Sequence, residues 1–194
     1  MLGYWKIRGL AQPIRYLLEF IEHPWEDKTY EQGDGPGFSI ECWTSVKGDL
    51  GLDFPNIPYM IDPNHDVKVT DCIAIMTYLC QQYAPELLGS TIEVRSETDV
   101  LYNHLKEAKQ AVTGPCYVGT NKEKLGQIAE KKMAPIVKYL GATKEYLCGE
   151  LTYIDFYFLE LCDFVQFLTG NTFYESNPNV AKYVKKMKGI PQLR

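Results

Sequence analysis

The fold is decided by residues 1–30, MLGYWKIRGLAQPIRYLLEFIEHPWEDKTY, at the start of the chain. Residues 1–6 form an apolar run that predicts a strand. Pro13 suits the first position of a helix, and apolar residues then recur at helical spacing over residues 14–21. Residues 25–30 predict a second strand. The chain therefore begins with a β-α-β unit.

A hairpin and a further helix are expected in the same part of the chain. Residues 58–62 and 67–69 are strand-like runs on either side of a Pro-Asn-His-Asp turn. Residues 70–71, Thr-Asp, suit the N-cap of a helix over residues 72–82. A β-α-β unit followed by β-β-α, with a proline entering the third strand, is a thioredoxin-like plan, although it contains no redox cysteine pair.

Only helical patterns follow in the second half of the chain. Amphipathic periodicity predicts helices over residues 93–112, 122–140, 155–168 and 179–188. Thr152 and Asp155 have capping-box spacing ahead of the third of these helices, with Asp in place of the usual Glu. This half is therefore predicted to be all-helical.

Two domains are the economical interpretation. Residues 1–82 are predicted to form a thioredoxin-like α/β domain, residues 83–91 a linker, and residues 92–194 an all-helical domain. The charge changes near the linker, because residues 1–82 carry a net −6 and the rest a net +1. The net charge of −5 argues against nucleic acid as the main partner.

The six cysteines are widely scattered, and no Cys-x-x-Cys pair occurs. Zinc ribbons and redox motifs need that close spacing, so no metal site is expected. In a chain of this size such thiols are expected to be buried, in a reducing compartment. The first residues show no basic n-region or cleavage site, so secretion is not expected. No apolar run approaches the roughly 20 residues of a bilayer span. These patterns predict a cytoplasmic protein without a membrane span.

Several longer motifs resemble those of mu-class glutathione transferases. They are LGYWKIRGLA at residues 2–11, IRYLLE at residues 14–19, GLDFPNIPY at residues 51–59, Thr152-x-x-Asp155-Phe156 and Pro178-Asn179. The resemblance spans nearly the whole chain. Because mu-class chains usually extend further at the C-terminus, the tail that helps to cover their substrate pocket is expected to be absent.

The resemblance implies a cytoplasmic detoxification enzyme, a glutathione transferase. Its thioredoxin-like domain would bind glutathione, and its all-helical domain would form the site for a hydrophobic electrophile. Glutathione would be a co-substrate, with no metal and no bound cofactor. The family forms homodimers, so a homodimer is the expected assembly.

Tyr4 is the candidate catalytic residue. It lies at a strand end, just before a turn that feeds a helix N-terminus, where its phenol can donate a hydrogen bond to a thiolate. Lowering a thiol pKa of about 8.5 by two units takes about 2.7 kcal/mol of preferential thiolate stabilisation. One hydrogen bond to a charged acceptor, at roughly 1.5–3 kcal/mol, supplies most of that. A tyrosine that caps the core is the alternative.

The resemblance also implies glutathione contacts on both sides of Tyr4. They are assigned to Trp5, Leu10, Trp43, Lys47, Asn56, Ile57 and Pro58. Lys47 would pair with the glycyl carboxylate, and the Trp43 indole would add an N–H donor. Pro58 resembles the family's cis-proline, which would turn the backbone of Ile57 toward the cysteinyl part of the peptide. For both tryptophans, ordinary aromatic packing is the alternative.

Three positions depart from the family's pattern. Asp71 and Cys72 replace glutamine and serine at the start of the third helix, and Ile40 replaces a usual arginine near the glycyl carboxylate. Asp71 is expected to receive the γ-glutamyl ammonium, while Cys72 and the helix N–H groups meet its carboxylate. A thiol donates more weakly than a hydroxyl, and Ile40 offers no charge. The glutathione site is therefore expected to have the family's arrangement, with weaker contacts to glutathione at these positions.

Two further residues are singled out by the resemblance. Cys116-Tyr117 resembles a Cys-Tyr pair on the electrophile side, where the tyrosine hydroxyl assists addition to epoxides. Phe54 matches the aromatic key that mu-class subunits insert into their partner, and it predicts a two-fold dimer. A packed surface loop is the alternative for Phe54.

Three functions remain open at this point. The first is a glutathione transferase that uses Tyr4. The second is a catalytically weakened relative that serves as a structural or interaction subunit of a larger assembly, which the departures at Ile40 and Cys72 favour. The third is a prostaglandin or other isomerase that uses the same thiolate.

Overall fold

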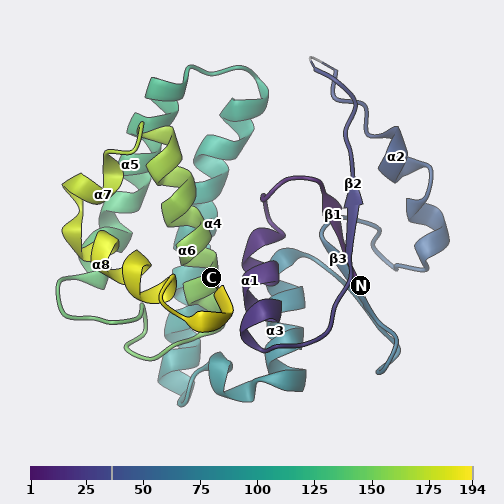
Figure 1. Ribbon diagram of the computed structural model, residues 1–194, viewed down its shortest axis with the longest axis horizontal. Coiled ribbons are helices and arrows are strands. Elements are labelled where there is room, and N and C mark those ends of the chain that lie inside the picture. The colour runs from purple at the N-terminus through teal and green to yellow at the C-terminus, as the bar shows by residue number, and fades with distance from the viewer. Residues whose placement is uncertain (36, 194) are drawn as a thin grey trace. The chain divides into compact units, whose positions relative to one another are not determined.

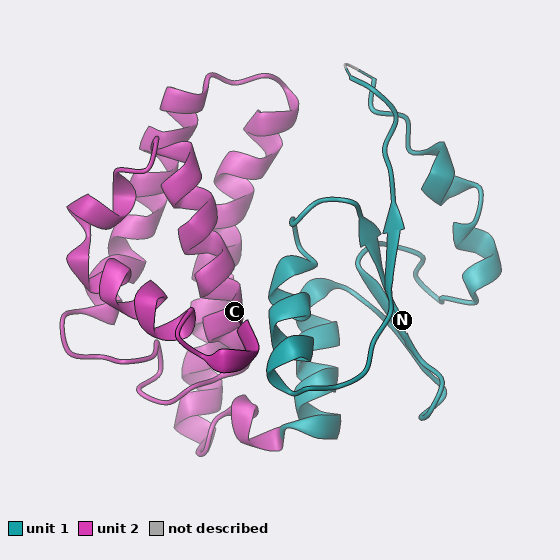
Figure 2. Ribbon diagram, viewed as in Figure 1, with its two compact units in different colours: residues 1–84 teal, residues 85–194 magenta. Residues whose placement is uncertain are grey.

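The computed structural model describes residues 1–35 and 37–193. The chain divides into two compact units, residues 1–84 and residues 85–194 (Figure 2). The division falls inside the segment 83–91 that was predicted as a linker.

The first unit is built on a four-stranded mixed sheet of order β2-β1-β3-β4. Its strands are β1 (Leu2–Trp5), β2 (Asp27–Tyr30), β3 (Tyr59–Asp62) and β4 (Val67–Thr70). β1 runs parallel to β2 and antiparallel to β3, and β3 forms the predicted hairpin with β4. The β-α-β and β-β-α plan is confirmed.

Helices lie on both sides of this sheet (Figure 1). α1 (Gln12–Phe20) and α3 (Cys72–Tyr83) pack together on one face, and the short α2 (Glu41–Thr44) and 3-10 helix η1 (Lys47–Leu50) lie beyond the other. The apolar side of α1 is buried at Pro13, Ile14, Leu17 and Leu18, as its periodicity predicts.

A buried carboxylate fastens α3 to the hairpin. Asp62, at the end of β3, accepts hydrogen bonds from the hydroxyls of Tyr78, at 2.7 Å, and Tyr83. Burial alone would raise the pKa of Asp62, but these donors hold that pKa below its usual value. The position of α3 relative to β3 is therefore fixed by charge-assisted hydrogen bonds as well as by packing.

The second unit is all-helical over residues 85–193. Its elements are η2 (Pro85–Leu88), α4 (Ile92–Tyr117), α5 (Lys122–Leu140), α6 (Tyr153–Leu168), α7 (Phe173–Ser176), α8 (Pro178–Met187) and η3 (Pro191–Leu193). α4, α5 and α6 pack side by side, and α8 contacts α5 and α6 (Figure 1). The predicted fold class, a thioredoxin-like domain followed by an all-helical domain, is confirmed.

Two expectations need correction. α4 does not end at residue 112 but stays helical to Tyr117. Pro115 lies two residues before the end of the helix, where the lost N–H donor and the crowding of its ring affect only a last turn that is largely exposed to solvent. The cysteines are all free, but they are not all buried: Cys42 and Cys116 are exposed. Free cysteines are buried in most proteins, but this average does not fix the position of any one residue. Cys42 and Cys116 lie on the solvent-facing sides of α2 and α4.

Candidate active site

The register of the sheet brings three of the predicted site residues to one end of it. Gly3 pairs with Tyr59 across β1 and β3, and Tyr59 pairs with Thr70 across β3 and β4. Tyr4, Pro58 and Asp71 are each one residue beyond these pairs. The Asp71 N–H donates to the Pro58 carbonyl at 3.1 Å, which continues the ladder, and the Ile57–Pro58 peptide bond is cis as predicted.

Tyr4 is held by the loop that joins β1 to α1. Its side chain is 6% exposed, and its hydroxyl oxygen accepts the Leu10 N–H at 3.0 Å. The backbone of Gly9 lies directly against the phenol, because a Cβ there would come within 2.5 Å of the Tyr4 oxygen. The accepted N–H polarises the phenol and makes its own O–H a stronger donor. Sequence reasoning found the turn after Tyr4 but missed this contact, which needs the loop geometry.

Asp71 caps α3 at the same end of the sheet. Its Oδ1 accepts the Ile73 N–H at 3.0 Å, and its backbone has a φ of +81°. The residue is exposed, so its carboxylate lies at the surface beside the positive end of the helix dipole. An anion-binding helix start and an acidic side chain thus lie together, which suits a ligand that carries both charges.

The thiol of Cys72 lies in the interior, unlike the exposed carboxylate of Asp71. The side chain is buried, and its Sγ lies 3.9 Å from the Sδ of Met76 one turn along α3. The structure thus gives the thiol a packing contact within the helix. The predicted donor role of this thiol gains no support, and the first-turn N–H groups of α3 stay the better candidates.

The side chain of Asn56 forms a hydrogen bond with the backbone of the next residue, Ile57. The Ile57 N–H donates to the Asn56 Oδ1 at 2.9 Å. The sequence predicted that the backbone of Ile57 faces the cysteinyl part of glutathione. A bound peptide that uses this N–H would therefore have to displace the Asn56 side-chain oxygen or share the N–H with it. This local bond between neighbours is typical of asparagine, and it could have been anticipated from the residue type.

Trp5 and Trp43 pack against the aromatic side chains of two strands, Tyr30 of β2 and Tyr59 of β3. Trp43 is 5% exposed and stacks on Tyr59, with ring centroids 5.8 Å apart. Trp5 meets Tyr30 edge to face at 6.4 Å. The hydroxyls of Tyr30 and Tyr59 are 2.8 Å apart, and burial with this bond holds the pKa of Tyr59 well above its usual value. The packing alternative is thus realised for both tryptophans, and their glutathione contacts remain predictions.

The residues expected near the glycyl carboxylate lie on the α2–η1 segment. Lys47 is exposed and is the first residue of η1. Ile40, which precedes α2, is 45% exposed, so an apolar side chain faces solvent there. Lys47 is therefore the predicted glycyl partner that this segment retains.

Two further predicted residues belong to other segments of the chain. Tyr117 is the last residue of α4, in the second unit, and is 55% exposed. Phe54 is on the loop before β3 and is 81% exposed, an unusual position for a large apolar side chain.

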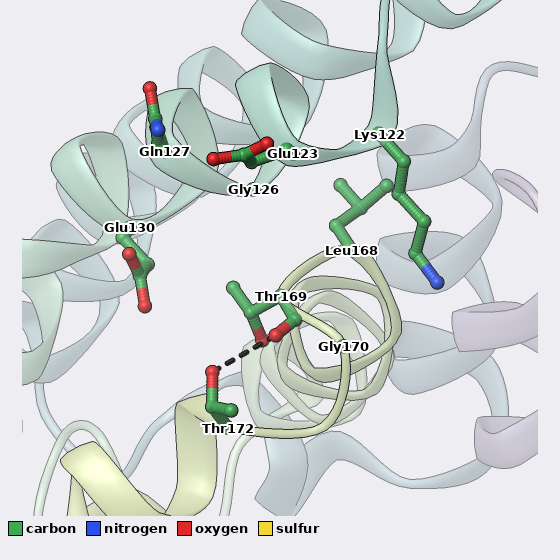
Figure 3. Close-up of a pocket in the computed structure, with 9 residues that line it drawn as sticks. All are labelled: Lys122, Glu123, Gly126, Gln127, Glu130, Leu168, Thr169, Gly170 and Thr172. Atoms are coloured by element: carbon green, nitrogen blue, oxygen red, sulfur yellow. Dashed lines mark hydrogen bonds between the residues drawn. The ribbon is translucent and has the colours of Figure 1, made fainter.

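A separate pocket of roughly 370 Å³ lies in the second unit (Figure 3). Residues from the first half of α5, the end of α6 and the turn that follows α6 line it, among them Glu123, Glu130 and Leu168. It contains none of the predicted site residues. In the close-up, the hydrogen bond drawn joins the Thr172 hydroxyl to the Thr169 carbonyl at 2.9 Å, and both residues lie on the pocket wall. The pocket brings no nucleophile and base together, so we do not assign the chemistry to it.

The described residues hold no group of three or more His, Cys, Asp or Glu side chains placed to bind a metal ion. No helix in residues 1–35 and 37–193 is both long and apolar enough to cross a membrane.

Sequence comparisons give one consistent family. Residues 1–81 match the family model described as the glutathione S-transferase N-terminal domain, and residues 102–194 match the corresponding C-terminal domain. A rat (Rattus norvegicus) protein named glutathione S-transferase Mu 2 is 34% identical over 99% of this chain and 87% of its own length. A glutathione S-transferase from Mesocricetus auratus is 32% identical over the same shares.

Structural comparison agrees with the sequence. The crystal structure of the glutathione S-transferase Blo t 8 has a TM-score of 0.84 and 26% identity, covering 99% of this chain and 88% of the other. A pi-class glutathione S-transferase of Onchocerca volvulus has the same TM-score and coverage at 24% identity, which shows the shared fold.

Proposed function

This chain belongs to the glutathione S-transferase family, and on that basis we propose that it adds the thiolate of glutathione to hydrophobic electrophiles, with Tyr4 as the catalytic residue. Membership of the family supports the transferase activity itself. The observation that carries the role of Tyr4 is the hydrogen bond of 3.0 Å from the Leu10 N–H to its hydroxyl oxygen. That bond orients the phenol at the end of the sheet where Pro58 and Asp71 also lie.

Tyr4 acts by stabilising the nucleophile. Its O–H donates to the glutathione sulfur, which favours the thiolate over the thiol and lowers the thiol pKa. The thiolate then forms a bond to an electrophilic carbon, and either a leaving group departs or an epoxide oxygen takes up a proton. Tyr117 is the proposed proton donor for the epoxide case. Glutathione is the co-substrate in this proposal, and no bound cofactor takes part.

The two ends of glutathione meet opposite charges. The α3 N-terminus attracts the γ-glutamyl carboxylate, and Asp71 attracts the adjacent ammonium. Lys47 pairs with the glycyl carboxylate. The backbone of Ile57, before the cis bond to Pro58, is the proposed partner of the cysteinyl part of the peptide, in competition with the Asn56 side chain.

The assembly and location proposed for the protein follow its relatives. We assign a homodimer in the cytoplasm, with Phe54 at the subunit contact. The alternative of a catalytically weakened subunit of a larger assembly is not favoured, since the named relatives are glutathione S-transferases over nearly the full chain. The changes at Ile40 and Cys72 are then adjustments of affinity.

Calorimetric titration of the protein with glutathione tests this proposal. We expect binding in the micromolar to millimolar range, and turnover of a chloro-dinitroarene that falls at least tenfold in Tyr4→Phe. S-methylglutathione is the matched control ligand, because it keeps both charged ends and has no ionisable thiol. Absence of glutathione binding at millimolar concentration would overturn the enzyme function, and unchanged turnover in Tyr4→Phe would remove Tyr4 from it.

A further inference from the structure

Arg15 makes an unusual set of contacts for a residue on the surface of a helix. It lies on α1, and its side chain is only 14% exposed. Its Nη1 donates to the carbonyl of Ile7 at 3.0 Å and reaches the Arg8 carbonyl at 3.5 Å. Its Nε and Nη2 donate to the two carboxylate oxygens of Asp27 at 3.1 and 3.4 Å.

These contacts join three parts of the first unit. Asp27 is the first residue of β2, and it pairs with Leu2 of β1. Ile7 and Arg8 belong to residues 6–11, the loop between β1 and α1. Only a planar guanidinium offers donors that reach a carboxylate and backbone carbonyls in the same arrangement, whereas a lysine ammonium is a single point of charge. Arg15 therefore anchors the loop to the sheet.

The anchored loop is the one that positions Tyr4. The Leu10 N–H donates to the Tyr4 hydroxyl, and the Gly9 backbone packs against the phenol ring. Apart from the Arg15 contacts, the Arg8 carbonyl accepts the Gln12 N–H at 2.9 Å. The loop is also held by Arg8 Nη2, which donates to the Tyr16 hydroxyl at 2.9 Å, and by the Lys6 N–H, which donates to the Tyr30 carbonyl at 2.8 Å. A loop that loses the guanidinium keeps these bonds and loses the side-chain contact that joins Ile7 and Arg8 to Asp27.

We propose that Arg15 is a positioning residue for the transfer reaction, because its guanidinium holds residues 6–11 so that the Leu10 N–H stays on the Tyr4 hydroxyl. The inference rests on the role proposed for Tyr4. It assigns Arg15 no contact with substrate. Its effect reaches the reaction through the direction and strength of the hydrogen bond that Tyr4 donates to the glutathione sulfur.

The test is the pKa of the thiol of bound glutathione, followed by the ultraviolet absorbance of the thiolate. Arg15→Lys keeps the charge beside Asp27 but cannot also hold the loop carbonyls. We expect the bound thiol pKa to rise by about half to one unit, so that the thiolate fraction falls about three- to tenfold below that pKa. The dissociation constant for glutathione should stay within about threefold.

Asp27→Ala supplies a second variant with a distinctive sign. Removing a carboxylate makes the surroundings more positive, which by charge alone lowers a thiol pKa. Releasing the guanidinium from Asp27 also loosens the loop that holds Tyr4, which raises the thiol pKa. We expect this second effect to be the larger, so that the thiol pKa rises in Asp27→Ala. Asp66→Asn is the control, because it removes an exposed carboxylate of the same unit in the turn between β3 and β4, outside residues 6–11. It should leave the pKa unchanged or slightly lower.

The outcomes separate this inference from the function of Tyr4. If Tyr4→Phe raises the thiol pKa but Arg15→Lys and Asp27→Ala lower only the melting temperature, Arg15 is structural and the proposal is overturned. If Tyr4→Phe itself leaves the thiol pKa unchanged, the role of Tyr4 fails first. Should Arg15→Lys not fold, the sign of the shift in Asp27→Ala decides alone.

Discussion

The side chain of Asp71 has a structural role and a proposed binding role, and substitutions can separate the two. Its Oδ1 caps α3 through the Ile73 N–H, while its charge is the proposed attraction for the γ-glutamyl ammonium. Asparagine caps helices about as well as aspartate and tolerates a positive φ. Asp71→Asn should therefore preserve stability within about 0.5 kcal/mol and weaken glutathione binding about tenfold or more, a loss of 1.4 kcal/mol or above.

Calorimetry and thermal unfolding of Asp71→Asn check both parts. Asp71→Ala is the comparison variant, since it loses the cap as well and should cost about 1 kcal/mol of stability. Cys72→Ser should bind glutathione within about twofold of the parent, because the thiol contacts Met76 inside the helix. Equal affinity of Asp71→Asn and the parent would exclude a charge contact at Asp71.

Gly9 sets how closely the loop approaches the phenol of Tyr4. It has a φ of +46°, and a Cβ would meet the Tyr4 oxygen at 2.5 Å. Gly9→Ala should therefore cost about 1–2 kcal/mol in backbone strain and displace the phenol, with turnover reduced at least tenfold. Gly48→Ala is the matched control, because a Cβ there has no neighbour within 4 Å. Steady-state turnover measures the effect, and normal kcat in Gly9→Ala would contradict the tight packing.

At the scale of elements, local signals predicted most of the fold. α1 has Pro13 at its start and an apolar side, and α6 has the Thr152–Asp155 capping box that the structure shows. The four-residue helices α2 and α7 were missed, because so few residues give no periodicity. α2 depends instead on a long-range contact, the stacking of its Trp43 on Tyr59.

The site divides in the same way. Tyr4, Pro58 and Asp71 were found because motifs of sequence carry them, and the strand register then places them at one end of the sheet. The Arg15–Asp27 pair escaped sequence reasoning, since nothing local marks which of several charged residues meet across twelve positions.

The capping box of α6 makes a prediction about pH. Asp155 is fully buried, and burial raises its pKa to about 6, although N–H donors at Leu147 and Thr152 and the Tyr183 hydroxyl favour the charged form. The folded protein then binds this proton more tightly than the unfolded chain, whose pKa is near 3.8. The contribution to stability is present below pH 3.8 and is lost as pH rises through 6.

Asp155→Asn isolates this contribution. The destabilisation caused by the substitution should shrink by about 2 kcal/mol between pH 4 and pH 7, because only the parent loses the proton. Chemical denaturation of both proteins at the two pH values measures the difference. A penalty that grows with pH would show that the hydrogen bonds outweigh burial and that the native carboxyl is stabilised as the anion.

At the scale of the whole molecule, Phe54 carries the prediction of a homodimer. It is 81% exposed in the isolated chain, and burying such an aromatic residue in a partner commonly contributes 2 kcal/mol or more. Phe54→Ala should weaken dimerisation at least tenfold in sedimentation experiments. Val118→Ala is the matched control, because Val118 is equally exposed and lies outside this loop. A monomer at micromolar concentration for the unmodified protein would refute the contact.

The central claim is that this chain holds glutathione as a thiolate on Tyr4, and one titration tests it most directly. The ultraviolet absorbance of the thiolate is followed against pH for glutathione bound to the unmodified protein and to Tyr4→Phe. A free thiol has a pKa of about 8.5. We predict a bound pKa about two units lower in the unmodified protein, and a return by at least one unit in Tyr4→Phe with affinity within a few-fold. A bound thiol that titrates at its free value in both proteins would contradict the account.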